Sequence, residues 1–559
     1  MHFPKPFAVL LFFCVGVCAR LTPQSLHTAA FSSSNLPIVV IDTHGRTIPD
    51  EPKIPATMGV IYTSDSVRNT LTDPFNHYNG RIMIEVRGSS SQQFDKKQYG
   101  FSTVDSAGAD LDVPLAGFPS EHSWILSAQF NDKSLVRDAV TFLSAREMGR
   151  YASRVKYCEL VLNGDYKGIY ILMEKIKRGK SRVNITKMGA ADTSGDALTG
   201  GYIFKTDKAD KASDQGWDAT FPPFSNGTAK RFMYQYEYPD PEEMSAAQKQ
   251  YLQSYVRSFE TVMIGLDYAD PVAGYPSVID VGSFADMVIL NELSRNVDGY
   301  RLSTFFYKDR DSKNKKLYAG PLWDYGLGYA NCNYYSAFES SGWQIDVLTS
   351  DPAFLRSDAF QAPFWWKRLW ADPAFKKAVA RRWSALRTGV LSQSRVFAKI
   401  DSISSVITEA RVRNFERWRI IGTWVWPNYY VSTSYEDEIA YMKGWMTKRF
   451  AWMDAALAPY VTGVAEEHDA IPSSFSLVQN FPNPFNPSTM IRFSVSAPQR
   501  VRLTVSDVLG REVAVLFEGV RQAGVHHVEW NAGSLPGGVY FCRMQADGSA
   551  SVIRMALMK

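Results

Sequence analysis

The cysteines limit how this chain can be stabilised. Of five cysteines in 559 residues, Cys14 and Cys18 lie in an N-terminal segment with the pattern of a cleavable secretory signal. The three others, Cys158, Cys332 and Cys542, are odd in number and far apart. They form neither a disulfide framework nor a zinc-binding pattern. A secreted chain of this kind must therefore fold around its hydrophobic core alone.

The N-terminal segment predicts export. An apolar run from Phe7 to Val17 follows a short basic start, and Val17 and Ala19 fit the small-residue pattern of a cleavage site. We therefore expect a signal peptide at 1–19 and a polar lead at 20–36. No later stretch approaches the roughly 18 apolar residues of a membrane helix, so we expect no transmembrane segment.

The overall composition is that of a folded globular protein with room for two or three domains. Hydrophobic residues make up 45% of the chain and charged residues 21%. The formal net charge of +4 is small for this length and gives no support to a nucleic-acid partner.

Hydrophobic periodicity predicts a mixed first part of the chain. "RIMIEVRG" alternates like a half-buried strand, and "YCELVLNGDYKGIYILMEKI" predicts a hairpin turning at Asn163-Gly164. "NDKSLVRDAVTFLSAREMG" predicts a helix capped by Asp132, and a second helix is expected to start with Asp240 as its N-cap. A third helix is expected from Ser283 to about Asn296.

The later part of the chain divides into a helical and an all-β region. Residues 352–460 predict mostly helix, and 461–474 have the acidic, proline-bearing composition of a linker. From 475 to 559, short strands at close spacing predict a small Ig-like β-sandwich.

Three stretches carry candidate chemistry. In "GPLWDYGLGYAN", Asp324 follows a predicted strand and precedes two glycines. This position suits either a buried capping residue or a metal ligand. In "ELSRNVDGYRLSTFFYKD", Asp298 is either a turn-forming residue or a carboxylate that orients a hydroxyl nucleophile. In "RGSSSQQFDKKQYGF", Lys96 and Lys97 follow a Gly/Ser turn that either is simply solvated or binds phosphate. A loop aspartate, a hairpin and then a second aspartate is the order found in protein kinases.

The motifs together resemble the spore coat protein H (CotH) kinase family. "RGSSSQQFDKKQYGF", "NDKSLVRD", "LVLNGDYKGIYILMEKI", "TGGYIFKTD", "NVDGYRLSTFFYKDRD" and "GPLWDYGLGYAN" follow the family's order within residues 80–345. The resemblance implies an α+β, atypical protein-kinase-like, two-lobed domain over 37–460. It also implies ATP- and Mg²⁺-dependent phosphorylation of secreted or surface proteins.

The same resemblance assigns roles to residues. Asp298 matches the catalytic aspartate and Asp324 the magnesium-binding aspartate. The positions implied to contact the nucleotide are Trp323 against the adenine, Lys96 or Lys97 at the phosphates, and Glu174 beside that lysine or the nucleotide.

Two departures from the family pattern leave the activity open. Many members carry a second acid where this chain has Gly326, and an asparagine where it has Ser303. Serine still ligates magnesium, but more weakly than a carboxylate. A catalytically weak or inactive kinase-fold binding protein is therefore the alternative to an active kinase. A secreted hydrolase is a third hypothesis, although no pair of acids is singled out for it.

The C-terminal segment resembles a different family. "FSLVQNFPNPFNPSTMIRFSV", "DVLGREVAVL" and "GVHHVEWNAGSLPGGVYFCRM" are similar to a type IX secretion C-terminal sorting domain, over about 475–559. The resemblance implies the type IX secretion machinery as a partner and a released or outer-surface location.

Overall fold

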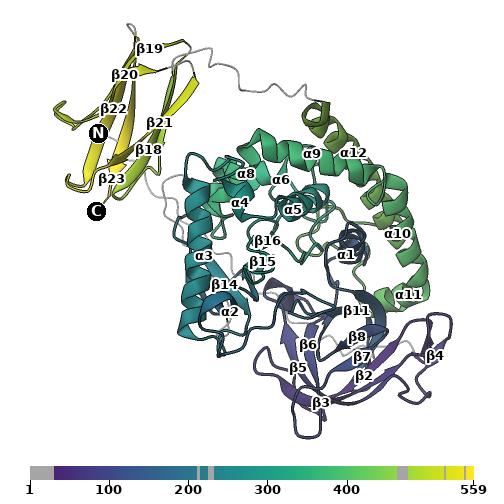
Figure 1. Cartoon of the computed structure of the whole chain (residues 1–559). Helices are drawn as coiled ribbons and strands as arrows, with labels where there is room; N and C mark the ends of the chain where they lie inside the picture. Colours follow the sequence, from purple (N-terminus) through teal and green to yellow (C-terminus); the bar gives the residue numbers. More distant parts are fainter. Residues whose placement is uncertain are drawn as a thin grey trace, which may run out of the picture.

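The computed structural model describes residues 31–209, 214–223, 232–462, 476–495, 497–521, 524–546 and 549–558 (Figure 1). The signal peptide expected at 1–19 lies outside these residues. So do most of the polar lead and most of the predicted linker.

A closed barrel forms the N-terminal part of the fold, drawn in purple to blue in Figure 1. Its strand order is β10-β11-β9-β6-β5-β3-β2, with β2 and β10 closing the barrel as a parallel pair. The strands are β2 Ile38–Asp42, β3 Ile54–Ile61, β5 Tyr78–Arg87, β6 Gln98–Val104, β9 Ser123–Ser127, β10 Val155–Leu162 and β11 Asp165–Glu174. Two short pairs accompany the barrel: β1 Ser33–Ser34 with β4 Asn69–Thr70, and β7 Val113–Leu115 with β8 Phe118–Glu121.

The predicted hairpin and strand are confirmed. β10 and β11 pair antiparallel, and Asn163 and Gly164 between them have φ angles of 52° and 74°. Two successive positive φ angles give the twist that matches a hairpin, and Asn-Gly adopts them at low cost. On β5, Ile82 and Ile84 are fully buried in the barrel core.

A second sheet, antiparallel and five-stranded, follows in the order β13-β14-β12-β15-β16. Its strands are β12 Tyr202–Thr206, β13 Gly216–Asp218, β14 Met233–Tyr238, β15 Thr304–Lys308 and β16 Tyr318–Ala319. β16 ends five residues before Asp324, so this aspartate lies in the loop beyond the strand rather than at its end.

Helices enclose this sheet, and α5 Val281–Ser294 lies at their centre (Figure 1). All of Ser283 to Ser294 is buried, which explains why this helix is rich in apolar residues and lacks a solvent-facing polar side. The remaining helices are α1 Arg137–Glu147, α2 Gly195–Leu198, α3 Ala246–Ile264, α4 Tyr275–Val278, α6 Gln344–Ser350, α7 Pro352–Ser357, α8 Phe364–Ala371, α9 Pro373–Arg387, α10 Gln393–Val406, α11 Thr408–Arg417 and α12 Tyr435–Thr462, with a 3₁₀ turn η1 at Ser90–Gln93. The helical character expected of 352–460 is confirmed.

The predicted start of α3 is wrong by several residues. Ser245, not Asp240, is the N-cap, and it forms a reciprocal capping box with Gln248. Asp240 instead closes a turn in which its carbonyl accepts from the amide of Glu243 at 2.9 Å. The capping box satisfies two free amides at once, which favours the later start.

The C-terminal region is all-β, as predicted. A three-stranded sheet, β17-β18-β21, is accompanied by a four-stranded sheet, β20-β19-β22-β23. The strands are β17 Ser476–Phe481, β18 Ser488–Val495, β19 Gln499–Ser506, β20 Glu512–Arg521, β21 Gly524–Asn531, β22 Gly538–Ala546 and β23 Ser549–Leu557. They share a core of their own that includes Ile491, Leu503, Trp530 and Met555.

The three later cysteines are separate in the fold. Cys158, Cys332 and Cys542 are buried free thiols. Among the described residues, none of the helices combines the length and apolar character that a membrane crossing requires.

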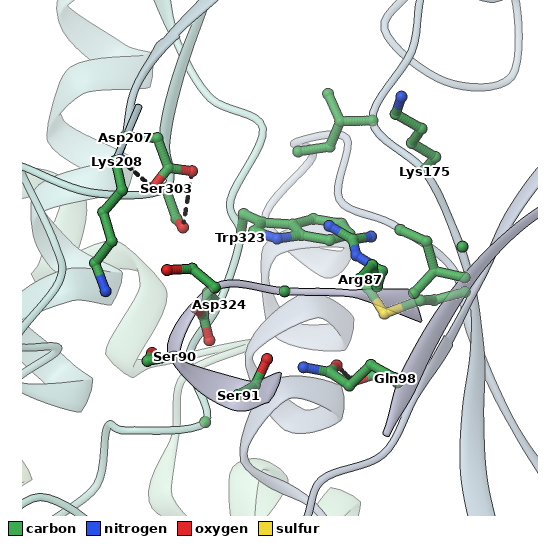
Figure 2. A pocket seen from close by; sticks show the side chains of 18 of the residues that line it. Arg87, Ser90, Ser91, Gln98, Lys175, Asp207, Lys208, Ser303, Trp323 and Asp324 are labelled. Atoms are coloured by element: carbon green, nitrogen blue, oxygen red, sulfur yellow. Dashed lines mark hydrogen bonds between the residues drawn. The ribbon is translucent and has the colours of Figure 1, made fainter. Parts of the chain in front are cut away.

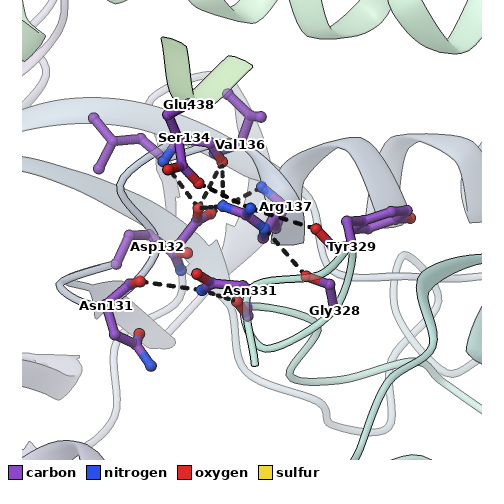
Figure 3. A network of polar contacts seen from close by, with 12 residues as sticks. Asn131, Asp132, Ser134, Val136, Arg137, Gly328, Tyr329, Asn331 and Glu438 are labelled. Carbon is purple, nitrogen blue, oxygen red and sulfur yellow. Dashed lines mark hydrogen bonds and ion pairs between the residues drawn. The ribbon is translucent and has the colours of Figure 1, made fainter. Parts of the chain in front are cut away.

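A buried arginine at the start of α1 connects three distant segments (Figure 3). Arg137 forms an ion pair with Asp132, and its Nη2 donates to Glu438 Oε1 on α12 at 2.9 Å. Its Nε donates to the carbonyl of Gly328 at 3.1 Å, and Nη2 lies 3.5 Å from the carbonyl of Tyr329. The side chain has no exposed surface. It therefore fixes the loop after Asp324 to α1 and to the C-terminal helix of the body.

We predict that Arg137→Met strongly destabilises this part of the protein. The change leaves two buried carboxylates without their cation, which costs about 3–5 kcal/mol. The thermal unfolding midpoint should fall by several degrees, whereas Arg381→Met on the exposed face of α9 should leave it nearly unchanged. Equal midpoints for the two variants would contradict the assigned role.

Candidate functional site

A pocket of about 440 Å³ lies between the barrel and the five-stranded sheet. Barrel strands β5, β6, β9 and β11 contribute to one side, and strands β12 and β14 to the other. The segment that contains Asp298, Ser303, Trp323 and Asp324 lines it as well (Figure 2). Four of the residues singled out from the sequence are therefore brought together.

Asp324 lies in a tightly held loop and opens onto the pocket. Its φ angle of 58° is unusual for a non-glycine residue, and such backbone strain persists only where the surroundings enforce it. The Asp324 carbonyl accepts from Asn296 Nδ2 at 3.1 Å, and the next amide, of Tyr325, donates to Asp138 Oδ1 at 2.6 Å. The Asp324 side chain is exposed into the pocket, although protein atoms surround it closely enough to desolvate its carboxylate.

Three further carboxylates surround Asp324, from segments far apart in the sequence. Asp138 comes from the first turn of α1, Asp207 follows β12, and Asp298 follows α5. Burial raises the pKa of Asp324 to about 8, and repulsion from the three neighbouring carboxylates adds to this effect. Burial likewise raises the pKa of Asp138 to about 6. A divalent cation with carboxylate ligands would relieve this repulsion.

Ser303 and Asp298 sit beside this cluster. Ser303 has a φ of 48°, and its Oγ donates to Asp207 Oδ2 at 3.4 Å. Asp298 Oδ1 accepts from Arg301 Nη2 at 3.1 Å, and the Asp298 amide donates to Asn296 Oδ1 at 3.1 Å. Burial raises the pKa of Asp207, while the neighbouring Lys205 ammonium opposes that rise.

The structure places both lysines expected at a phosphate, Lys96 and Lys97, outside the lining of this pocket. Lys96 Nζ is buried and donates to the carbonyl of Ile169 at 2.5 Å and to Asn414 Oδ1 at 2.9 Å. Lys97 Nζ donates to the carbonyl of Gln92 at 2.6 Å. Neither lysine lines the pocket. Lys96 thus joins barrel strand β11 to α11, whereas Lys97 holds the turn η1 before β6.

Glu174 also has a structural partner rather than a place in the pocket. Its side chain is buried, and Oε1 accepts from Arg154 Nη1 at 2.7 Å. Oε2 accepts from the Arg154 amide at 2.9 Å. It pairs with neither lysine proposed from the resemblance, because it faces the segment before β10.

The pocket is also lined by charged residues that the sequence analysis did not single out. Lys205 on β12 pairs with Glu237 on β14, with Nζ and Oε2 3.1 Å apart. Asp207 is two residues later in the motif "TGGYIFKTD", and Asp138 ends the motif "NDKSLVRD". Both motifs were recognised, but their charged residues were given no role. The only signal in the sequence was that these charged residues lie inside motifs of the family resemblance. Their spacing does not show that they meet at Asp324.

A second group of potential metal ligands lies away from this pocket. Ligand atoms of Asp112, Glu121 and His122 lie within 4.8 Å of one another. However, Lys177 Nζ contacts His122 Nε2 and lies 3.6 Å from Glu121 Oε1. An ammonium therefore already lies against two of these three residues, so the pocket around Asp324 is the stronger candidate for a cation.

These features define a mixed α/β protein with a carboxylate-rich pocket suited to a divalent cation and an anionic ligand. The sequence profile described as CotH kinase protein matches residues 84–453, more than half of the chain. The chain belongs to this family. A second profile, the secretion system C-terminal sorting domain, matches residues 479–558 and indicates secretion or an outer-surface location.

Other comparisons add little to this assignment. No curated protein matches the chain. An endo-beta-1,4-mannanase from Thermotoga petrophila is 9% identical with a TM-score of 0.11, and the match covers 24% of this chain and 26% of that one. The twitchin kinase region from C. elegans is 11% identical with a TM-score of 0.13, covering 94% and 99% of the two chains. Scores this low establish no shared fold.

The buried environment of Lys96 predicts a pH dependence of stability. Burial lowers its pKa from 10.5 to about 7. Between these values the unfolded chain binds more protons at this position, so the contribution of Lys96 to stability rises with pH. The thermal unfolding midpoint of the parent, measured relative to that of Lys96→Met, should therefore rise between about pH 7 and pH 9.5.

Lys448→Met, at an exposed lysine of α12, is the matched control and should show no such trend. A difference between parent and Lys96→Met that stays constant with pH would contradict the assignment.

Proposed function

We propose that the protein is a secreted atypical protein kinase, which transfers phosphate from ATP to hydroxyl side chains of exported or surface proteins. In this proposal the barrel is the N-terminal lobe of a kinase-like fold, and the five-stranded sheet with its helices is the C-terminal lobe. The observation that carries the proposal is the convergence of Asp138, Asp207, Asp298 and Asp324 on one pocket beside cationic side chains.

The residues present fit a divalent cation. No described residue donates a hydrogen bond to the Asp324 carboxylate, and acidic neighbours raise its pKa. Asp324 would hold the cation with Asp207, and Ser303 Oγ lies next to them. When bound, Mg²⁺ would neutralise charge on the phosphates of ATP.

In this proposal, carboxylates from other segments would take the place of the acid missing at Gly326. Asp138 and Asp207 bring two carboxylates to the pocket from other segments, so Asp324 is not the sole anionic ligand available. This supports an active kinase over the alternative of an inactive binding protein. Asp298 would accept the proton of the acceptor hydroxyl, and its bond with Arg301 Nη2 orients the carboxylate.

Lys205 takes the role that the sequence assigned to Lys96 or Lys97. Lys205 lines the pocket and its ammonium is paired with Glu237, as a kinase lysine is paired with its glutamate partner. In such transfer the protein mainly positions the groups and neutralises charge, and these are tasks that the lining residues perform.

The first test of the proposal is phosphate transfer. The purified chain, given ATP labelled at the γ-phosphate and Mg²⁺, should label itself or a co-secreted protein. Asp298→Ala should lower the rate by about 10²–10⁴-fold, and Asp324→Asn by at least about 10²-fold. Asp401→Asn, at an exposed position on α10, is the control and should retain the parent rate. A parent without transfer would contradict the kinase, and ATP binding in its absence would favour the binding protein.

The second test is direct cation binding. Calorimetry with Mn²⁺ and a non-hydrolysable ATP analogue should show binding that Asp324→Asn weakens at least about tenfold, since a lost carboxylate ligand costs about 1.4 kcal/mol or more. Ser303→Ala should have a smaller effect, because a hydroxyl is the weaker ligand. Unchanged affinity in Asp324→Asn would place the cation elsewhere.

A further inference from the structure

Two side chains pack against the indole of Trp323. Phe142 of α1 stacks on it with ring centroids 6.2 Å apart and an interplanar angle of 25°. The Arg87 guanidinium lies over the ring at 5.4 Å from its centroid. An adenine stacked on Trp323 would compete with these groups for the ring. This arrangement differs from the base-stacking role that the family resemblance implied.

Arg87 is placed in the pocket by a constrained turn. It is the last residue of β5, and Gly88 after it has a φ of 103°. A Cβ at Gly88 would lie 2.0 Å from Ser91 Oγ, so the turn excludes any larger residue there. Figure 2 shows the guanidinium over Trp323, with Asp324 on one side of it and Lys175 on the other.

The stacked guanidinium keeps its hydrogen-bonding edge available. In the part of the chain that the structure describes, no residue accepts a hydrogen bond from it. By contrast, Lys205 is paired with Glu237, and Lys53 Nζ donates to Ser102 Oγ at 2.9 Å. A guanidinium has five N–H donors in one plane, and stacking on an aromatic ring occupies none of them.

The charge on Arg87 is maintained by its surroundings. Burial lowers its pKa, but the carboxylates of Glu237, Glu85, Asp324 and Asp207 oppose that change. The result is a fixed cation next to the acidic cluster. Once cations occupy that cluster, the same guanidinium faces an anionic ligand with a planar pair of donors, which matches two phosphate oxygens.

We propose that Arg87 binds the phosphate chain of the pocket's ligand through paired N–H donors, and that Trp323 supports Arg87 rather than the base. The inference rests on the proposed function only in naming a nucleoside triphosphate as the source of that chain. The inference gives both side chains a part in binding the phosphate chain. Trp323 holds the plane of the guanidinium, and Arg87 makes the contact.

The test uses tripolyphosphate, which has the phosphate chain but no base. Calorimetry with Mg²⁺ and tripolyphosphate, and separately with Mg²⁺ and ATP, compares the parent with Arg87→Met, Arg87→Lys and Trp323→Leu. Arg87→Met should lower the affinity for both ligands about ten- to a hundredfold, the range expected for the loss of charged hydrogen bonds. Arg87→Lys should recover part of this loss, because it keeps the charge but not the paired donors.

Trp323→Leu separates the two roles of the indole. If the indole supports Arg87, Trp323→Leu lowers the affinities for tripolyphosphate and for ATP by the same factor. Its effect is then not additive with that of Arg87→Met. If the indole stacks on the base, Trp323→Leu lowers the affinity for ATP alone, and the proposal is overturned. Unfolding midpoints of all variants, with Arg381→Met as control, establish that each remains folded.

The outcomes also distinguish this inference from the kinase proposal. Affinity for tripolyphosphate that is unaffected by Arg87→Met overturns the inference while leaving phosphate transfer intact. Affinity that depends on Arg87 in a protein without transfer activity supports the inference and contradicts the kinase. A parent that binds neither ligand contradicts both.

Discussion

Two adjacent residues at the start of α1 hold the loop on which the site depends. Arg137 Nε donates to the carbonyl of Gly328, and Asp138 Oδ1 accepts from the amide of Tyr325. The segment after Asp324 is therefore fixed at both ends by one helical turn. Arg137 is itself neutralised by Asp132 and Glu438, which ties the arrangement to α12. Asp324 cannot move out of the pocket without breaking these buried bonds.

This anchoring explains how the fold tolerates clustered acids. Burial and repulsion from its acidic neighbours oppose the charged form of Asp324 and raise the pKa of its carboxyl to about 8. The stabilising contacts lie on the far side of the loop, in the Arg137 network and in the apolar packing of Tyr325. The site can thus stay acidic and ready for cations because its stability comes from elsewhere in the structure.

Local patterns predicted much of the fold and part of the site. The Asn163-Gly164 hairpin, the buried helix α5 and the C-terminal strands all follow from periodicity and turn chemistry. Asp298 and Asp324 were found because a short hairpin joins them. Lys96 was misplaced because its partner Asn414 is 318 residues away, and no local spacing reveals such a contact. Asp138 and Asp207 were missed for the same reason, since tertiary packing alone brings them to Asp324.

The most direct measurement is anomalous diffraction from a crystal grown with Mn²⁺ and a non-hydrolysable ATP analogue. The account predicts a manganese peak within ligand distance of the carboxylates of Asp324 and Asp207, with the analogue's phosphates beside it. A peak only at other carboxylates, or analogue density outside this pocket, would contradict it.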